Sequence, residues 1–218
     1  MGLFSFKKSG AKSKISKTTS KNETFYGREN HIISMDNFIE TIFHEPEEGT
    51  VFRKTDKPLV FGKIPIHEIT EERLLDVMGK SDFTLDNSES IPGHMVYFFR
   101  DTAGYYKFLF QFHFLNGEFF FLKNKISSSA TIVSSEDKTK VISQLSKKYN
   151  VGDKEDDSNF LIQITDPNGN IAYTTDTVYF YISYLRGGDF LKELHKKYAN
   201  YEPEEVEDEF GESLEKYL

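Results

Sequence analysis

The alternation of apolar and polar positions is clearest in the two hydrophobic runs that flank the dipeptide Asn116-Gly117. This arrangement is the strongest short-range signal for a β-hairpin. With these two residues as the turn, the pattern places Phe112 opposite Phe121. One face of the hairpin then carries six phenylalanines: Phe108, Phe110, Phe112, Phe114, Phe119 and Phe121. We expect this face to form the core and the opposite face to stay partly exposed.

Helical and strand periodicities alternate along the rest of the chain. Apolar residues every three or four positions predict helices at 34–43, 70–79, 134–149 and 189–198. Shorter apolar runs predict strands at 51–53, 59–61, 94–100, 160–165, 171–174 and 178–185. Tight turns between neighbouring strands make them antiparallel, and the helices are too few for a parallel βαβ sheet. The prediction is an α+β fold, an antiparallel sheet with helices packed on one face, built as a degenerate tandem of helix-plus-three-strand units.

Charge divides the chain into three parts. Residues 1–22 hold six lysines and no acidic residue, whereas residues 201–218 hold eight acidic residues and one lysine. Such polar segments bury too little apolar surface to fold alone. The predicted organisation is a disordered basic tail (1–24), a single α+β domain (25–200) and an acidic C-terminal tail (201–218).

Two further points concern these parts. The order of elements suggests that the domain contains two similar units, at about 30–130 and 131–200. At the start of the chain, Leu3, Phe4 and Phe6 lie next to lysines. A peripheral membrane contact and an ordinary frayed terminus both fit that pattern, and the sequence leaves the choice open.

The composition limits the possible chemistry. The 218 residues include no cysteine, which excludes disulfides, thiolate metal sites and cysteine nucleophiles and agrees with a reducing compartment, so we expect a cytoplasmic protein. No apolar run approaches the length of a membrane-spanning helix, so no integral membrane association is expected. The net charge of −8, with lysines concentrated in the tail, argues against nucleic-acid binding.

The sequence predicts neither a metal site nor a bound cofactor. Its six histidines are scattered without the spacing of a metal motif. Residues 166–170, Asp-Pro-Asn-Gly-Asn, resemble a calcium loop but lack the later glutamate, and are read as a hairpin turn. Gly187-Gly188 is followed by no Lys-Ser/Thr pair, so it indicates a helix break and not a phosphate loop.

One set of residues suggests catalysis. His113 lies on the second face of the predicted hairpin, and His94 and Arg100 lie on the preceding strand. Together they form a candidate polar pocket in which a histidine acts as general base. No nucleophile or orienting carboxylate is fixed by the spacing, so histidines on a partly covered sheet face are the simpler interpretation.

A short resemblance points to an architecture. Residues 71–82 read Glu-Glu-Arg-Leu-Leu-Asp-Val-Met-Gly-Lys-Ser-Asp and precede the predicted strands. This stretch resembles the T-x-E-x-x-L-x-x-L-G-x-P-D opening of BamE/SmpA-like and β-lactamase-inhibitor-protein-like units. Such units lay helical segments on an antiparallel sheet, often in tandem, and bind proteins. The chain departs from the pattern at Ser81, where the family has proline, and it lacks the family's cysteines. The resemblance therefore implies an architecture and no particular site.

Two functions follow from these observations. The first is a non-catalytic protein-binding module of the inhibitor, immunity or adaptor type, whose partner is another protein with a basic surface. Aromatic side chains commonly anchor such partners. The candidate anchors are Tyr105, Phe120, Tyr179, Tyr181 and Phe210. The alternative is an enzyme or binder of a small ligand, with a pocket near His94, Arg100 and His113. The sequence does not determine the oligomeric state.

Overall fold

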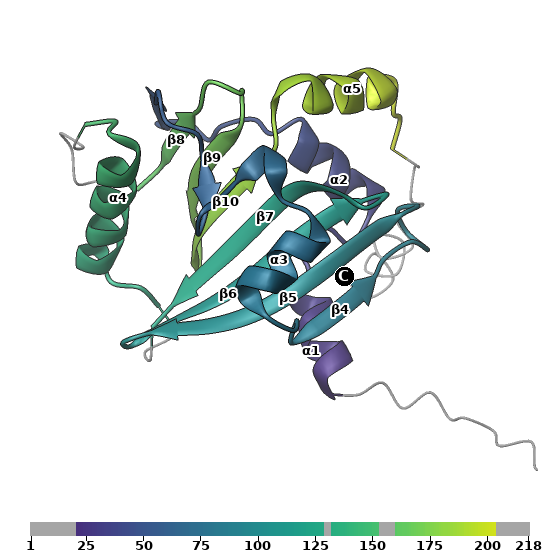
Figure 1. The fold of residues 1–218 in the computed structure, drawn as a ribbon, viewed down its shortest axis with the longest axis horizontal. Coiled ribbons are helices and arrows are strands. Elements are labelled where there is room, and N and C mark those ends of the chain that lie inside the picture. Colours follow the sequence, from purple (N-terminus) through teal and green to yellow (C-terminus); the bar gives the residue numbers. More distant parts are fainter. Residues whose placement is uncertain (1–20, 129–131, 153–159, 204–218) are drawn as a thin grey trace, which may run out of the picture.

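The computed structural model describes residues 21–128, 132–152 and 160–203, which form one sheet covered by helices (Figure 1). The eight strands of the sheet follow the spatial order β1-β8-β9-β10-β7-β6-β5-β4. In chain order they are β1 (Val51–Lys54), β4 (Phe83–Asp86), β5 (His94–Ala103), β6 (Tyr106–Leu115), β7 (Glu118–Ser127), β8 (Ile162–Thr165), β9 (Ile171–Asp176) and β10 (Phe180–Leu185). A separate small hairpin is formed by β2 (Val60–Phe61) and β3 (Ile64–Pro65). The helices are α1 (Lys21–Glu29), α2 (Met35–Ile42), α3 (Glu71–Met78), α4 (Ser135–Tyr149) and α5 (Gly188–Tyr198), with a short 3₁₀ turn, η1, at Ile66–Glu68.

The predicted α+β class and antiparallel sheet are confirmed. Each neighbouring pair in the sheet is antiparallel except β1 and β8, which run parallel. Three of the four predicted helices begin after a hydroxyl side chain that caps them. Ser34, Thr70 and Ser134 each accept a hydrogen bond from the backbone N–H three residues later. The caps explain why these helix starts are readable from the sequence.

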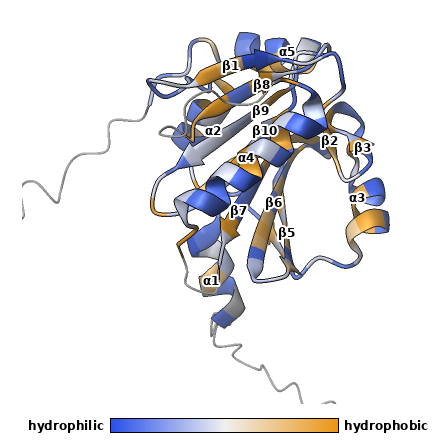
Figure 2. Ribbon diagram, turned by 90° about the vertical axis from the view of Figure 1, so that its left-hand side faces the viewer, coloured by the Kyte–Doolittle hydropathy of each residue, from blue (hydrophilic) through white to orange (hydrophobic). Residues whose placement is uncertain are grey.

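The helices cover both faces of the sheet, so the expectation of helices on one face is wrong (Figure 2). α3, α4 and the β2–β3 hairpin pack on one side, here called the α4 face. α1, α2 and α5 pack on the other side, here called the α2 face. Both sides are buried because the central strands β6 and β7 carry large apolar residues on both faces, above all at residues 119–122. One-sided packing would leave half of these side chains exposed to water.

The register of the central hairpin differs from the expected one. Phe114 pairs with Phe119 as predicted, but an irregularity then shifts the pairing between His113 and Phe114. As a result Phe112 lies opposite Leu122, and Phe121 lies opposite His113. One extra residue in a strand sends every later side chain to the other face. Phe121 therefore packs on the α2 face and not with the other phenylalanines.

The start of the domain also differs from the expectation. Residues 21–24 were expected in the disordered tail, yet they form the first turn of α1. This helix is held on the α2 face by Tyr26, which is buried and stacks on Phe83 with ring centroids 4.8 Å apart. Residues 1–20 and most of the acidic tail lie outside the described residues.

The sheet is continuous across the two predicted units. β4 to β7 form one meander and β8 to β10 form another, and the two join where β7 pairs with β10. β1 belongs to the first predicted unit but pairs with β8 of the second. Strands of both predicted units therefore belong to one sheet, and the similarity of the two units remains a prediction.

Candidate functional site

The two candidate catalytic histidines are buried side by side on the α2 face. Nε2 of His94 lies 3.0 Å from Nδ1 of His113, and neither side chain is accessible to solvent. Arg100 lies six residues further along β5, is exposed, and lines a groove that contains neither histidine. The structure thus brings the histidines together but does not place Arg100 in a cavity with them.

The hydrogen bonds of the histidine pair define its protonation. The side-chain Nδ2 of Asn87 donates to the carbonyl of Ile32 and to Nδ1 of His94, both at 3.1 Å. His94 therefore holds its proton on Nε2 and donates it to Nδ1 of His113. His113 in turn holds its proton on Nε2, which is buried and has no partner among the described residues.

Burial keeps both histidines neutral. It lowers the pKa of His94 to about 4. Burial also holds the pKa of His113 well below its ordinary value, with smaller electrostatic contributions from the neighbouring His94, His31 and Lys123. A general base must reach the proton it removes, and these two rings are sealed from solvent. The arrangement is that of a polar element of the core.

A row of lysines and tyrosines crosses the α2 face next to the histidines. Nζ of Lys125 lies 3.6 Å from the ring centroid of Tyr179, and Nζ of Lys123 lies 4.5 Å from that of Tyr181. Strands β7 and β10 are neighbours in the sheet, so the two pairs repeat along it. A cation above an aromatic ring is attracted electrostatically to the face of that ring, most strongly where water is excluded.

Glu29 at the end of α1 and His31 in the loop after it complete this row. Nζ of Lys125 forms an ion pair with Glu29 at 2.8 Å, and Nζ of Lys123 lies 2.9 Å from Nδ1 of His31. Burial lowers the pKa of Lys123 to about 8. Burial and the charge of Lys123 lower the pKa of His31 to about 3. The packing of α1 and its loop thus positions these cations.

An open groove of about 420 Å³ adjoins this row, beside α1. We call it the α1 groove, and its principal residues are Phe25, Glu29, Arg100, Lys107, Lys125 and Tyr179. The guanidinium of Arg100 lies over the rings of Phe25 and Tyr26, at 4.8 and 4.9 Å from their centroids. Aromatic and cationic groups in one groove are suited to contact aromatic or carboxylate side chains of another molecule.

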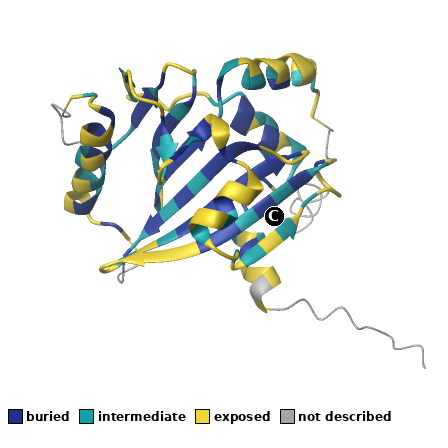
Figure 3. Ribbon diagram, viewed as in Figure 1, coloured by how far each residue is buried: buried dark blue, intermediate teal, exposed yellow. Residues whose placement is uncertain are grey.

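Exposed apolar side chains gather at the same end of the sheet. The β5–β6 turn, the loop after β7 and the β9–β10 turn lie side by side there because β6, β7 and β10 are adjacent strands. We call this the turn end, and Figure 3 shows the exposed tip of the β5–β6 hairpin there. Its exposed apolar residues are Tyr105, Ile132 and Val178, with Phe25 of α1 beside the groove.

Tyr105 is held in place although it is exposed. Its hydroxyl donates to Oδ1 of Asp137 at 2.6 Å, and the hydroxyl of Tyr106 donates to the same oxygen at 2.7 Å. These two hydrogen bonds lower the pKa of Asp137 to about 2, and the bond from Tyr105 has the largest effect. The ring of Tyr105 is therefore ordered before any partner arrives.

The predicted partner-binding residues differ in where the structure places them. Tyr105 lies at the turn end, and Tyr179 and Tyr181 lie in the row beside the α1 groove. Phe120 was expected to be exposed, but it is completely buried under α2, where its ring meets Phe38, so it cannot anchor a partner. Phe210 lies outside the described residues.

Sequence reasoning missed several groove residues. Phe25 sits in a polar segment at the edge of the expected tail, and Lys125 lies on β7, whose pairing with β10 was not predicted. Val178, next to the predicted anchor Tyr179, carried a readable signal, because two adjacent large apolar residues in a turn are unusual on a polar surface.

The loop that resembles a calcium site is a structural turn, as predicted. The carboxylate of Asp166 accepts hydrogen bonds from the backbone N–H groups of Leu59, Asn168 and Asn170 and from the side chain of Asn170. Its oxygens are therefore occupied by the protein. Within residues 21–128, 132–152 and 160–203, no group of three or more His, Asp or Glu side chains is placed to hold a metal ion.

Gly187 serves close packing. A Cβ atom built there would lie 1.8 Å from the carbonyl oxygen of Gly169, so no other residue fits without a shift of the backbone. The N–H of Gly187 donates to Oδ1 of Asn170 at 2.9 Å. The glycine thus seats the start of α5 on the β8–β9 turn.

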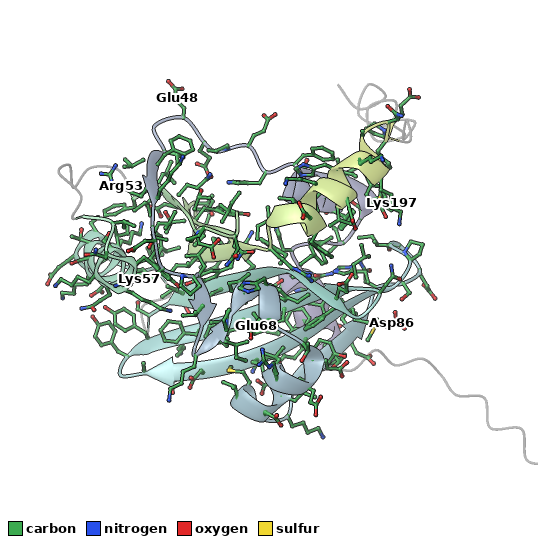
Figure 4. The ribbon with its side chains drawn as sticks, turned by 45° about the horizontal axis from the view of Figure 1, so that its top comes forward. Glu48, Arg53, Lys57, Glu68, Asp86 and Lys197 are labelled. Carbon is green, nitrogen blue, oxygen red and sulfur yellow. The ribbon has the colours of Figure 1, made fainter. Side chains whose placement is uncertain are left out.

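The remaining charges are spread over the molecule. Figure 4 shows Glu48 before β1, Arg53 on β1, Asp86 on β4 and Lys197 on α5. These acidic and basic side chains are not gathered on one element. In the part of the chain that the structure describes, no helix is long and apolar enough to cross a membrane. Comparison with family models, with curated proteins and with solved structures finds no match to this chain.

Proposed function

We propose that this chain is a non-catalytic protein-binding module of the inhibitor, immunity or adaptor type, and that it contacts its partner through the turn end and the α1 groove. The observation that carries the proposal is the gathering of exposed apolar side chains around one groove. Tyr105, Ile132 and Val178 come from three separate connections of the sheet, yet they meet at the same end.

The chemistry of this surface supports a protein partner. Interface cores are enriched in aromatic residues and arginine, and a few such residues supply most of the binding energy. The α1 groove offers Phe25, Tyr179 and Arg100 within one hollow. Tyr105 is already fixed by its bond to Asp137, so its binding loses little side-chain freedom.

The histidines support the non-catalytic part of the proposal. The small-ligand alternative needs His94, Arg100 and His113 around one pocket. His94 and His113 are buried as a neutral hydrogen-bonded pair, and Arg100 faces a different groove. We therefore favour the binding module over the enzyme.

The proposed partner has a basic surface around its contact segment. The net charge of the chain is −8, and opposite net charges speed association over distances longer than a contact. Short-range selection is then left to the α1 groove, where Arg100 and Lys107 suit an acidic or aromatic side chain of the partner.

The test compares two matched substitutions in full-length chains used as bait. Ile132 at the turn end is 62% exposed, and Ile33 before α2 is 56% exposed. Ile132→Asp should abolish retention of a partner that the wild type captures, while Ile33→Asp should retain it, because only the first places a charge in the proposed interface. Circular dichroism checks that both variants fold.

The captured protein is then purified and titrated into each chain by calorimetry. A partner that binds the Ile132→Asp and wild-type chains equally well would contradict the proposed surface. A small molecule turned over by the wild type and not by a His94→Gln variant would contradict the non-catalytic assignment.

A further inference from the structure

Three positively charged residues of the α1 groove lie on one face of the sheet. Arg100 of β5 and Lys125 of β7 both lie opposite Leu109 of β6, and Lys107 precedes Leu109 by two residues on the same strand. Residues in these positions point to the same face of a sheet. Lys107 is a diagonal neighbour of both other cations, which places its Cα about 7–8 Å from each of theirs. All three side chains line the same groove, so one bound group can reach more than one of them.

Only one of these three cations has a carboxylate partner. Nζ of Lys125 donates to both carboxylate oxygens of Glu29, at 2.9 and 2.8 Å. Within residues 21–128, 132–152 and 160–203, no carboxylate oxygen lies within 4.0 Å of a side-chain nitrogen of Arg100 or Lys107. The charges of Arg100 and Lys107 are therefore left for a group from another molecule.

Two acidic residues lie close to Arg100 in the fold, and both bind the backbone. Oδ2 of Asp82 accepts a hydrogen bond from the backbone N–H of Arg100, and Oδ1 of Asp101 accepts one from that of Thr102, both at 2.7 Å. Asp101 also follows Arg100 directly on β5, so its side chain leaves the strand toward the opposite face. These carboxylates hold the strand ends and leave the Arg100 guanidinium without an ion pair.

The guanidinium of Arg100 is already placed for binding. It lies over the rings of Phe25 and Tyr26, which restrict its movement. A guanidinium that is packed against rings keeps N–H donors at its edge, and these donors match the oxygens of a phosphate or carboxylate in pairs. Lys107 is exposed and adds a second positive charge beside it.

The rest of the groove lining is apolar and aromatic. Leu109 lies between the cations on the sheet and is 8% exposed, while Phe25 of α1 is 40% exposed. Tyr179 lines the same groove from the β9–β10 turn. A small anion would contact the cations and leave this lining in water. An aromatic ring attached to the anion would cover it, because rings pack well against other rings and aliphatic side chains.

We infer, building on the proposed function, that the α1 groove binds a phosphorylated tyrosine side chain of the partner. The phosphate lies between Arg100 and Lys107, and the ring packs against Leu109 and Phe25. A phosphate monoester carries a charge of about −1.5 to −2 at pH 7 and three acceptor oxygens. It therefore matches two cations that lack a carboxylate, whereas a carboxylate side chain brings a single charge. The phosphate stays on the tyrosine, and no bond is formed or broken.

The test is an NMR titration of the isotope-labelled full chain with three small probes. They are the N-acetyl amides of phosphotyrosine, tyrosine and phosphoserine. The tyrosine probe lacks the anion and the phosphoserine probe lacks the ring. The wild type should bind the phosphotyrosine probe at least about tenfold more tightly than either of the others, because only this probe makes both kinds of contact.

Charge-removing variants and matched controls locate the phosphate. Arg100→Gln and Lys107→Gln should each weaken binding of the phosphotyrosine probe several-fold, because each removes one charge from the groove. Arg53→Gln and Lys54→Gln remove the same charges from β1, outside the groove, and should leave binding unchanged. Circular dichroism checks that all four variants fold.

A second pair of variants locates the ring. Phe25→Ser should lower the affinity for the phosphotyrosine probe toward that for the phosphoserine probe. Phe52→Ser removes the same ring from β1, where Phe52 is 60% exposed, and should leave both affinities unchanged.

Three results with these probes would overturn the inference. The first is the absence of saturable binding of the phosphotyrosine probe to the wild type. The second is equal affinity for the phosphotyrosine and phosphoserine probes, which would show that the ring is not recognised. The third is binding that persists in a folded chain carrying both Arg100→Gln and Lys107→Gln.

The captured partner separates this inference from the proposed function. Ile132 does not line the α1 groove, so Ile132→Asp tests the turn end by itself. A partner that still requires Ile132 but binds the wild type equally well after phosphatase treatment would overturn the phosphotyrosine site and leave the binding module in place. Loss of retention by the wild type after phosphatase treatment is the expected result.

Discussion

Both faces of the sheet are covered by helices, but the groups buried on the two faces differ in chemistry. On the α2 face, His94, His113 and Gln111 are buried among apolar residues. Hydrogen bonds tie Gln111 directly, and the histidine pair through Asn87, to the end of α1 and the segment that leads into α2. On the α4 face, the centre of the sheet is a layer of phenylalanines, and Asn124 lies in it with an unpaired oxygen. The α2 face is closed over its histidines and opens at the α1 groove, whereas the α4 face stays open beneath the middle of one helix.

The difference shows what the covering elements do. The end of α1 and the segment after it supply backbone partners: Gln111 donates to the carbonyl of Glu29 at 2.7 Å and accepts from the N–H of His31 at 2.9 Å. α4 supplies apolar side chains, whose attraction for the sheet has no direction. Polar groups therefore fix the fit of the α2 face. On the other face, hydrogen bonds to Asp137 near the start of α4 and to the carbonyl of Tyr149 at its end hold the helix in place.

The largest expected effect tests whether both faces are core. Phe112 lies on the α4 face and Phe120 on the α2 face, and both are completely buried. Replacing either by alanine should lower the free energy of unfolding by about 3–5 kcal/mol, through lost burial and a residual cavity. Urea melts measure both. If Phe120→Ala left the free energy of unfolding almost unchanged, the core would lie on one side of the sheet only.

An intermediate effect is expected from acid, and it acts on the α2 face. The folded chain lowers the pKa of His94 to about 4, whereas an unfolded histidine titrates near 6.5, so the unfolded chain binds more protons between these values. Stability is therefore complete above pH 6.5 and falls as the pH drops toward 4. His94 alone should lower the free energy of unfolding by about 2 kcal/mol between pH 7.5 and pH 5.

The measurement is a pair of urea melts at those two pH values. The His94→Gln variant removes this titration, and its loss between pH 7.5 and pH 5 should be smaller than that of the wild type. The same loss in both chains would show that the α2 face is not the source of the acid sensitivity.

The smallest expected effect has the opposite sign and acts on the α4 face. Asn124→Leu removes a buried oxygen that has no donor. The free energy of unfolding should rise by about 1 kcal/mol, the size of the penalty for one unpaired polar group. Thermal melts give the comparison. A clear fall in stability would show that the amide has a hydrogen-bond partner in the folded chain.

The sequence predicted the strands and helices better than it predicted which sides they bury. The hairpin turn was readable because Asn116 and Gly117 both adopt positive φ, at 51° and 81°, which few other residues tolerate. The register beyond it was not readable. Residues 119–122 are all apolar, so the period of two carries no information about where an extra residue is placed.

The candidate site was predictable in part for a similar reason. Tyr105 and Tyr179 stand out because they are aromatic residues in or beside turns. The burial of His113 depends on α1 and α2, and α1 carries only Tyr26 as a buried apolar residue, too little for a helical pattern. The open groove of about 410 Å³ under the middle of α4 depends on how far this helix stands from the sheet. Tertiary contacts decide that distance, and the local sequence does not.

The parallel pairing of β1 with β8 has a consequence for synthesis of the chain. Val51 meets Ile162, 111 residues later, whereas the strands from β4 to β7 each meet the next one along the chain. During translation the β4–β7 meander is therefore complete long before β1 has anything to pair with. Contacts between distant residues form slowly because a long loop must close first. Strand β1, the first strand of the sheet in the chain, is thus expected to be the last to join it. Its backbone amides should exchange with solvent sooner than those of β5, β6 and β7 at the centre.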